Sequence, residues 1–335
     1  MKGVLGIIST NYNSEALGHL TDSRPVASLP LGGRYRLLDF PLTNMVKSDI
    51  TTVGLITPFY YRSIMDHVGN GQPWGLAKRR GGLFVMPGTV YGERENKCRF
   101  VLKDLIRNRR LIDRSSASYV LLCDASKVLR MSYDPFCRAH VKSGKKATFL
   151  YTKEGHVFLD CLVMDKQYLI EILDAYKNSD SMDLTEVLLS EDSNHPIGEY
   201  EYDGYVGIVN DISDYVRVNM DLLDTNIGTE LLPGLMTKVQ DAPPALYREN
   251  SDVSRSVISS GCIIKGKVEN SIIARNVIVG EGAVVKNSII MQRCTIGDGA
   301  HIENAVLDKY VNISPDVIIK GSEAQPIVVE KNAKL

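Results

Sequence analysis

The chain has 335 residues, of which 44% are hydrophobic and 24% are charged, and its formal net charge is −1. This length is enough for two ordinary domains, and the near-neutral charge provides no overall field that would attract nucleic acid or an anionic membrane. No apolar run approaches the roughly 18 residues that a membrane span needs. The first residues also lack the pattern of a signal peptide. We therefore expect a cytoplasmic protein that binds neither nucleic acid nor membrane.

The cysteines are scattered along the chain, with no C-x-x-C pair and no histidine at metal-ligand spacing. This pattern predicts buried free thiols in a reducing compartment, with no metal site and no disulfide framework. The six residues are Cys98, Cys123, Cys137, Cys161, Cys262 and Cys294.

Residues 1–245 alternate short apolar runs with helical patterns. The predicted strands cover 4–8, 52–56, 119–123, 147–151 and 157–164, and the predicted helices cover 63–69, 100–115, 134–143, 166–178 and 213–223. Such alternation indicates a three-layer α/β domain, Rossmann-like in class, with a mainly parallel sheet. Ligands of such domains bind at the carboxyl ends of the strands, so the loop after Ile8 is the first place to look for chemistry.

The pattern changes after Pro243-Pro244, where an aliphatic residue recurs about every six positions between glycines and asparagines. This repeat predicts a left-handed parallel β-helix over residues 246–335, with the repeated aliphatic side chains pointing inward. An antiparallel sandwich would instead need strict alternation with turns every 8–12 residues. The repeated positions are Ile258, Ile264, Ile273, Val279, Val285, Ile290, Ile296 and Ile302.

The most specific stretch is residues 31–44, which read Leu-Gly-Gly-Arg-Tyr-Arg-Leu-Leu-Asp-Phe-Pro-Leu-Thr-Asn. It closely resembles the G-G-x-x-R-x-x-D-F-x-L-S-N signature of glucose-1-phosphate adenylyltransferases, and the resemblance extends over nearly the whole chain. Those enzymes make ADP-glucose from ATP and glucose 1-phosphate, and they join a Rossmann-like catalytic domain to a C-terminal left-handed β-helix. The signature positions here are Gly32, Gly33, Arg36, Asp39 and Asn44.

The reaction of that family displaces pyrophosphate from ATP, so charge on phosphate oxygens must be stabilised. Backbone amides of a glycine-rich loop, basic side chains and carboxylate-held Mg²⁺ are the usual means. The family's first loop, L-A-G-G-x-G-T-R-L, corresponds here to residues 8–17, where the glycines are absent and Ser9, Asn11 and Glu15 stand instead. The lysine of the family's K-P-A-V segment aligns with Val26.

Three further motifs of the family are also altered. The nucleotide motif G-T-A-D-A aligns with residues 96–100, Asn-Lys-Cys-Arg-Phe. The metal aspartate of A-G-D-H aligns with Ser126, although Asp124 lies two residues earlier, and the second metal aspartate aligns with Ile208. The sugar-phosphate segment F-V-E-K-P has no counterpart after Lys153-Glu154, where the chain is short.

These losses together predict a regulatory, catalytically impaired subunit, similar to the non-catalytic glycogen-biosynthesis subunit that some Gram-positive bacteria pair with an active homologue. The resemblance implies a hetero-oligomer, a tetramer, with an active glucose-1-phosphate adenylyltransferase subunit. It implies no catalytic residue, metal or cofactor in this chain, whereas active homologues use Mg²⁺. One alternative is an active nucleotidyltransferase with a rearranged phosphate loop that uses Arg99, Lys97 or Asp124. Another is a sensor that binds a sugar phosphate without turnover.

Four other features admit more than one interpretation each. Arg24 and Arg36 align with basic residues of the family's sugar-phosphate effector site, whereas Ser23 and Pro30 stand where some effector-sensitive homologues are basic. The two arginines are therefore candidates for an effector anion site or for ordinary ion pairs. The run Lys78-Arg79-Arg80-Gly81-Gly82 suits a phosphate, a partner or a solvated loop, and Trp74 suits an interface or a core.

Overall fold

The computed structural model describes residues 3–12, 14–90, 98–178, 183–190 and 196–335. The chain divides into two compact units by its internal contacts. The first comprises residues 1–15, 24–28 and 37–206, and the second comprises residues 16–23, 29–36 and 207–335. The unit that contains the β-helix therefore also includes residues 207–245 and two short N-terminal segments.

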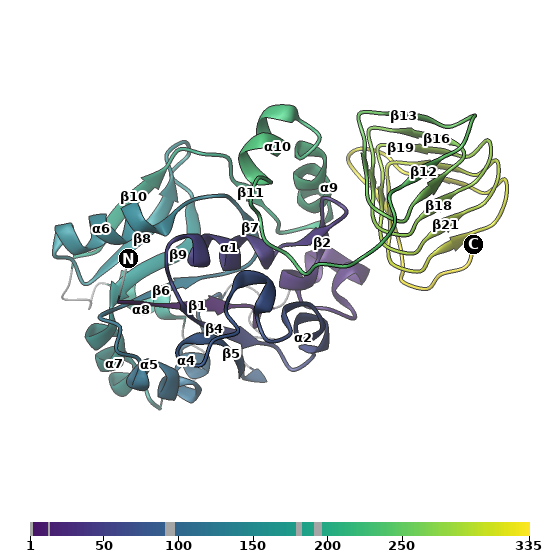
Figure 1. Cartoon of the computed structure of the whole chain (residues 1–335). Coiled ribbons are helices and arrows are strands. Elements are labelled where there is room, and N and C mark those ends of the chain that lie inside the picture. The colour runs from purple at the N-terminus through teal and green to yellow at the C-terminus, as the bar shows by residue number, and fades with distance from the viewer. Residues whose placement is uncertain (1–2, 13, 91–97, 179–182, 191–195) are drawn as a thin grey trace. The chain divides into compact units, whose positions relative to one another are not determined.

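The first unit is built on a seven-stranded sheet with the order β10-β8-β9-β6-β1-β4-β5 (Figure 1). Strand β9 runs antiparallel to β6 and β8, and the other pairs are parallel. The mainly parallel sheet is thus confirmed, and β5 and β10, which the sequence did not predict, form its edges. The bounds are β1 Val4–Ser9, β4 Thr52–Thr57, β5 Gly82–Pro87, β6 Tyr119–Cys123, β8 Ala147–Thr152, β9 Phe158–Asp165 and β10 Gly198–Tyr202.

Helices α4, α5, α7 and α8 cover one face of this sheet, where Leu105, Ile112 and Leu169 meet side chains of β1, β6 and β9. Helix α6 packs beside β8, β9 and β10. The helix predicted over 100–115 is broken at Asn108, whose Nδ2 donates to the carbonyl of Pro87 at 2.9 Å instead of leaving the helix continuous. The helices are α1 Asp39–Lys47, α2 Arg62–Val68, α4 Leu102–Arg107, α5 Arg109–Arg114, α6 Tyr133–Ser143, α7 Lys166–Ala175 and α8 Leu184–Leu189.

The second unit contains a small antiparallel hairpin, β2 Pro30–Leu31 and β3 Tyr35–Arg36, beside helix α9 Ile212–Asp221. The hydroxyl of Tyr215 donates to the carbonyl of Pro30 at 2.6 Å, and Asn219 Oδ1 accepts from the backbone of Gly32 at 3.0 Å. Helix α10, Thr225–Leu231, follows α9. These bonds tie the family signature to a helix almost two hundred residues later.

The β-helix consists of three parallel five-stranded sheets, β12-β15-β18-β21-β24, β13-β16-β19-β22-β25 and β14-β17-β20-β23-β26 (Figure 1). The repeated aliphatic residues from Ile264 to Ile302 lie in one buried column, and Ile258 packs against its end, as the sixfold pattern predicted. The short strands run from β12 Leu246–Tyr247 to β26 Ile327–Val329. Between them lie β13 Asp252–Ser254, β14 Val257–Ile258, β15 Ile263–Ile264, β16 Lys267–Glu269, β17 Ile272–Ile273, β18 Ile278–Val279, β19 Val284–Lys286, β20 Ile289–Ile290, β21 Thr295–Ile296, β22 His301–Glu303, β23 Ala305–Leu307, β24 Asn312–Ile313 and β25 Ile318–Lys320.

Among the described residues, no helix combines the length and apolar character needed to cross a membrane. The six cysteines are free thiols and all are buried, as the sequence predicted.

Candidate functional site

The loop after β1, where the family's phosphate loop would lie, binds to its own surroundings. The backbone nitrogen and the hydroxyl of Thr10 both donate to the carbonyl of Ile56, at 2.9 and 2.7 Å. The Nδ2 of Asn11 donates to the carbonyl of Thr89 at 2.8 Å and to Asp104 Oδ2 at 2.7 Å. A phosphate-binding loop presents free amides to its ligand, whereas these polar groups already hold neighbouring segments.

The carboxylate of Asp104 is the partner that fixes this loop. It also accepts from the backbone nitrogen and the hydroxyl of Thr89, each at 2.6 Å. Burial raises the pKa of Asp104, and the hydrogen bonds from Thr89 and Asn11 oppose that rise. A Cβ on Gly88 would lie 2.2 Å from Asn11 Nδ2, so the Asn11 side chain occupies space that only a glycine leaves open.

Next to it, Tyr12 is fully enclosed, and the guanidinium carbon of Arg99 lies 4.3 Å from the centre of its ring. A guanidinium over an aromatic face at this distance forms a cation–π contact. The following residue, Phe100, donates its backbone nitrogen to Asp183 at 2.8 Å. This bond fixes the backbone directly beside Arg99.

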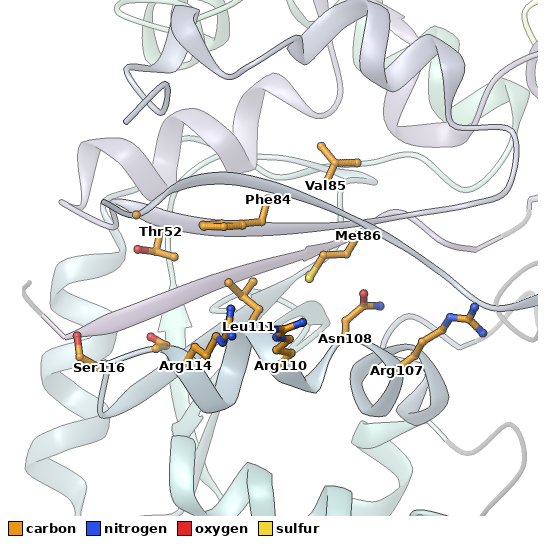
Figure 2. A pocket seen from close by; sticks show the side chains of 12 residues that line it. Thr52, Phe84, Val85, Met86, Arg107, Asn108, Arg110, Leu111, Arg114 and Ser116 are labelled. Atoms are coloured by element: carbon orange, nitrogen blue, oxygen red, sulfur yellow. The ribbon is translucent and has the colours of Figure 1, made fainter. Parts of the chain in front are cut away.

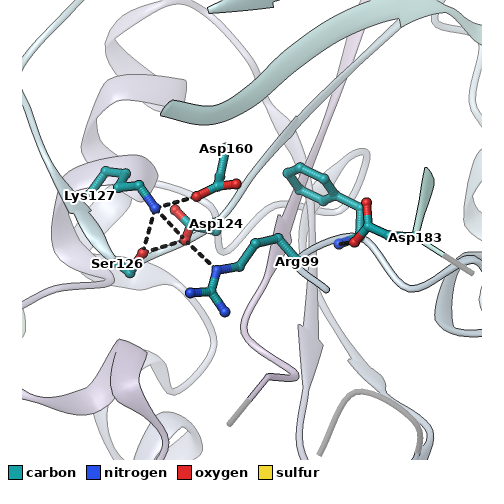
Figure 3. A network of polar contacts seen from close by, with 7 residues as sticks. Arg99, Asp124, Ser126, Lys127, Asp160 and Asp183 are labelled. Carbon is teal, nitrogen blue, oxygen red and sulfur yellow. Dashed lines mark hydrogen bonds and ion pairs between the residues drawn. The ribbon is translucent and has the colours of Figure 1, made fainter. Parts of the chain in front are cut away.

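A buried ion cluster, Arg99–Asp124–Lys127–Asp160, lies beyond the carboxyl end of β6 (Figure 3). Lys127 Nζ donates to Asp160, to the Ser126 hydroxyl at 2.9 Å and to Asp124 Oδ2 at 3.4 Å. Ser126 donates to the same Asp124 oxygen at 2.5 Å, and Arg99 Nε lies 3.5 Å from it. The ammonium of Lys127 therefore pairs with both carboxylates, and Arg99 supplies the second positive charge of the cluster.

The electrostatics of this cluster are set by burial. The side chains of Asp124 and Lys127 are only 1% and 6% exposed. Burial raises the pKa of the Asp124 carboxyl, and the positive charge of Lys127 counteracts this. Burial would by itself lower the pKa of Lys127, but Asp124 and Asp160 raise it above its ordinary value. The two carboxylates thus favour the protonated form of Lys127.

The residues at this edge do not fit a Mg²⁺ ion. Magnesium requires carboxylate or phosphate oxygens in near-octahedral geometry, and both carboxylates are bonded to a lysine. Among the described residues no group of three or more acidic, histidine or cysteine side chains is placed to hold a metal. Asp124, which the sequence left open as a metal ligand, is an ion-pair partner here.

The other positions at which the sequence departs from the family lie as follows. Ser9 ends β1 and is buried, Val26 is buried in a 3₁₀ turn, and Glu15 is exposed. Ile208 lies in the short strand β11, Gly207–Ile208, of the second unit, where its carbonyl accepts from Arg217. Asn96 and Lys97 lie outside the described residues.

The short segment after Lys153-Glu154 is a closed β-hairpin turn between β8 and β9. The Thr152 nitrogen donates to the Val157 carbonyl, and the Val157 nitrogen donates to the Thr152 hydroxyl, both at 2.9 Å. The rings of Tyr151 and His156 stack at 4.3 Å across it. These contacts close the turn within the described residues.

The family signature has structural roles in both units. In the second, Gly33 has φ +70°, and a Cβ there would lie 2.7 Å from Ser259 Oγ in the β-helix. In the first, Asp39 meets His67 Nε2 at 2.5 Å, and both residues are buried. Asn44 donates to the Leu129 carbonyl at 2.9 Å and accepts from Arg130 at 3.0 Å.

The features with two interpretations are partly decided. Trp74 is buried and packs edge-on against His67, so it is a core residue and not an exposed interface anchor. The basic run from Lys78 to Arg80 is exposed and leads into β5. Arg24 is buried in the first unit and Arg36 is half-buried in β3 of the second, and their effector site stays a prediction.

Sequence reasoning identified the altered loop but missed three members of the clusters at this edge, Tyr12, Lys127 and Asp160. A signal for Lys127 was available, because Asp-Ala-Ser-Lys directly follows a wholly apolar strand. Asp160 gave none, since it lies inside a strand and its φ of +46° is a property of the folded chain.

Comparison with known proteins agrees with this architecture. The nucleotidyl transferase family model matches residues 15–157, and the model of the GlmU-like C-terminal hexapeptide matches residues 243–326. A glucose-1-phosphate adenylyltransferase of Pseudothermotoga lettingae is 28% identical, covering 85% of this chain and 77% of its own. The glycogen biosynthesis protein GlgD of Geobacillus stearothermophilus is 36% identical, and that of Bacillus subtilis is 33% identical. Each alignment with a GlgD protein covers 98% of this chain and 96% of the relative. The chain therefore belongs to the family of the glycogen biosynthesis protein GlgD.

Proposed function

We propose that this chain is a regulatory, catalytically impaired subunit of a glucose-1-phosphate adenylyltransferase that acts in glycogen biosynthesis. The observation that carries the proposal is the ion cluster at the carboxyl edge of the sheet. There Lys127 bonds to both Asp124 and Asp160, and Arg99 covers Tyr12. The names of the most similar relatives in the comparison support the pathway.

The chemistry of adenylyl transfer explains why this edge argues against turnover. Attack on the α-phosphate of ATP needs preorganised donors aimed at phosphate oxygens, and loss of one such donor typically lowers the rate by about 10²–10³. Here Thr10 and Asn11 are bonded within the fold, and Val26 stands in place of a lysine. Several simultaneous losses of this size leave no useful rate.

Under this proposal, the metal and the catalysis belong to a partner subunit. Mg²⁺ and the catalytic residues would belong to an active homologous subunit. With that subunit, this chain would form a hetero-oligomer that is a tetramer. Because parallel β-helices leave coil faces on the surface, they commonly provide oligomer contacts. The contribution of this chain would be to change the kinetics or effector response of the active subunit.

The test is to purify the chain alone, the active homologue alone and the co-expressed pair, and to measure mass and ADP-glucose formation for each. We expect no activity from the chain alone and a mixed oligomer with altered KM, kcat or response to sugar phosphates. Robust activity of the chain alone would refute the proposal. A mixed oligomer with unchanged kinetics would reduce the role to a structural one.

Two further measurements separate the alternatives. Tight, Mg²⁺-dependent ATP binding by the isolated chain in calorimetry would favour an active enzyme with a rearranged loop. For a sugar-phosphate effector site, Arg36→Ala should abolish the effector response of the mixed oligomer, while Arg36→Lys should retain part of it. Equal responses of wild type and Arg36→Ala would exclude this residue from the site.

A further inference from the structure

Two of the buried cysteines lie directly opposite each other in the central sheet. In the antiparallel pair of β6 and β9, Cys123 is the register partner of Cys161. At the next position of the same ladder, the backbone nitrogen of Asp124 donates to the carbonyl of Asp160 at 3.0 Å. Hydrogen-bonded and non-hydrogen-bonded pairs alternate along an antiparallel ladder, so the two cysteines form a non-hydrogen-bonded pair.

This position in the ladder suits a disulfide bond. The Cα atoms of a non-hydrogen-bonded pair are about 4.5 Å apart, and the two side chains project from the same face of the sheet. A disulfide needs Cα atoms about 4.4–6.8 Å apart. The preceding pair, Leu122 and Leu162, keeps the same register, so the ladder is regular up to the cysteines. The two sulfur atoms can therefore be joined without a shift of the backbone.

The surroundings of the pair are closed to large molecules. Cys123 and Cys161 are each 3% exposed, and neither lines the open groove between β5 and helices α4 and α5 (Figure 2). Burial raises the pKa of both thiols, and the nearby thiols of Cys123 and Cys137 add to the rise at Cys161. Slow reaction with a small, neutral oxidant is the chemistry that such an enclosed pair permits.

We propose that Cys123 and Cys161 form a reversible cross-strand disulfide when the protein meets a peroxide. One sulfur attacks a peroxide oxygen, the O–O bond breaks, and the thiol proton leaves in a water molecule, which gives a sulfenic acid. The second sulfur then attacks the first, the S–O bond breaks, and a second water leaves. Two thiols and one hydrogen peroxide thus give one disulfide and two waters. The inference goes beyond the proposed function and does not depend on it.

The disulfide would lie directly beside the ion cluster. Asp124 follows Cys123 and Asp160 precedes Cys161, and these are the two acids that pair with Lys127 (Figure 3). A bond between the cysteines would hold the ends of β6 and β9 together at this edge. It would also close a loop in the unfolded chain, so the oxidised protein should be the more stable form.

The β-helix contains an internal control. Cys262 and Cys294 are also buried, and their thiols donate to the carbonyls of Ala274 and Asp308 at 3.0 and 2.9 Å. They directly precede strands β15 and β21, which are separated by β18 in the same sheet. Two strand spacings amount to about 9–10 Å, which exceeds the reach of a disulfide. Burial is thus shared with the cross-strand pair, but the geometry is not.

The test is to treat the native, full-length chain with hydrogen peroxide and then remove the peroxide with catalase. The protein is next unfolded in urea with N-ethylmaleimide, digested without reductant and mapped by mass spectrometry. We expect one linked peptide pair, Cys123 with Cys161, that dithiothreitol separates. The other thiols should carry maleimide: Cys98, Cys137, Cys262 and Cys294. The urea midpoint of the oxidised protein should rise and return on reduction.

Two variants complete the design. Cys161→Ser should give no linked peptide and no change in midpoint on peroxide treatment, whereas Cys137→Ser should form the link at the wild-type rate. The map of the wild type decides the proposal even where a variant does not fold. The proposal fails if Cys123 and Cys161 both carry maleimide, or if Cys161 is linked to Cys137 instead. It also fails if the two are converted to sulfinic acids without a link, or if the linked protein has an unchanged or lower midpoint.

Discussion

Replacing Lys127 by methionine tests whether the ion cluster stabilises the carboxyl edge of the sheet. Methionine nearly preserves the volume but removes the charge and the three hydrogen bonds to Asp160, Ser126 and Asp124. Removing one partner of a buried ion pair typically costs about 3–5 kcal/mol, because the other charge is left uncompensated. Asp160 is 21% exposed and solvent relieves part of this penalty, so we expect about 3 kcal/mol.

The sign of its pH dependence follows from Asp124. Burial and Asp160 raise the pKa of Asp124, and Lys127 is the largest influence that lowers it, so the variant raises this pKa further. A carboxyl whose pKa is higher in the folded state contributes stability that persists in acid and is lost as pH rises through the folded pKa. The variant should therefore lose less stability at pH 5 than at pH 8.

Urea denaturation of both proteins at pH 5 and pH 8 measures these differences. The matched control is Lys146→Met, which breaks a half-exposed pair with Asp165 at 3.2 Å and should cost no more than about 1 kcal/mol at either pH. If Lys127→Met behaves like Lys146→Met, with a small and pH-independent loss in the free energy of unfolding, the ion cluster does not stabilise this edge of the sheet.

Three further outcomes are expected. Gly33→Ala forces a Cβ onto a φ of +70° and into Ser259, so it should lower the free energy of unfolding by at least about 1 kcal/mol. The control Gly234→Ala has a φ of +67° but no neighbour within reach of the new Cβ, so it measures the cost of the backbone conformation alone. Ile290→Ala, in the buried column of the β-helix, should cost about 2–5 kcal/mol in a thermal or urea melt, and the outward Ile278→Ala in the same coil much less. Burial raises the pKa of Cys137 and Cys294 to about 12, so a thiol reagent at pH 8 should label native protein far more slowly than unfolded protein. The free energy of unfolding should also fall as pH rises above the ordinary thiol pKa of about 8.5. Rapid labelling of the native protein would contradict this.

Local sequence patterns were sufficient to predict much of the fold. The sixfold repeat places one aliphatic residue in each inward position, so the buried column of the β-helix could be read directly. Strands β1, β4 and β6 are continuous apolar runs, which buried parallel strands require. The edge strands were missed because β10, Gly-Glu-Tyr-Glu-Tyr, is half polar and β5 begins with glycine and ends with proline.

The contacts at the site could not be read in the same way, because they join residues distant in sequence. Asn11 meets Asp104 across 93 positions, and Lys127 meets Asp160 across 33. The helix break at Asn108 likewise depends on a bond to Pro87 from another element. Nothing in the local composition of either partner selects the other, so the sequence could predict a changed loop but not what its new side chains bind.

The way these side chains pair also bears on how catalysis could be restored. Under the proposed function, placing an aspartate at Ser126 would not by itself rebuild a metal site. That change would remove a hydroxyl that donates to Asp124 and accepts from Lys127, and it would add a third carboxylate beside those of Asp124 and Asp160. A glycine at Asn11 would likewise remove one of the three hydrogen bonds that Asp104 accepts and open space beside Gly88. Each altered residue is now held by a neighbour, so single reversions should lower stability before they add activity, and restoring catalysis requires the loop and the ion cluster to be replaced together.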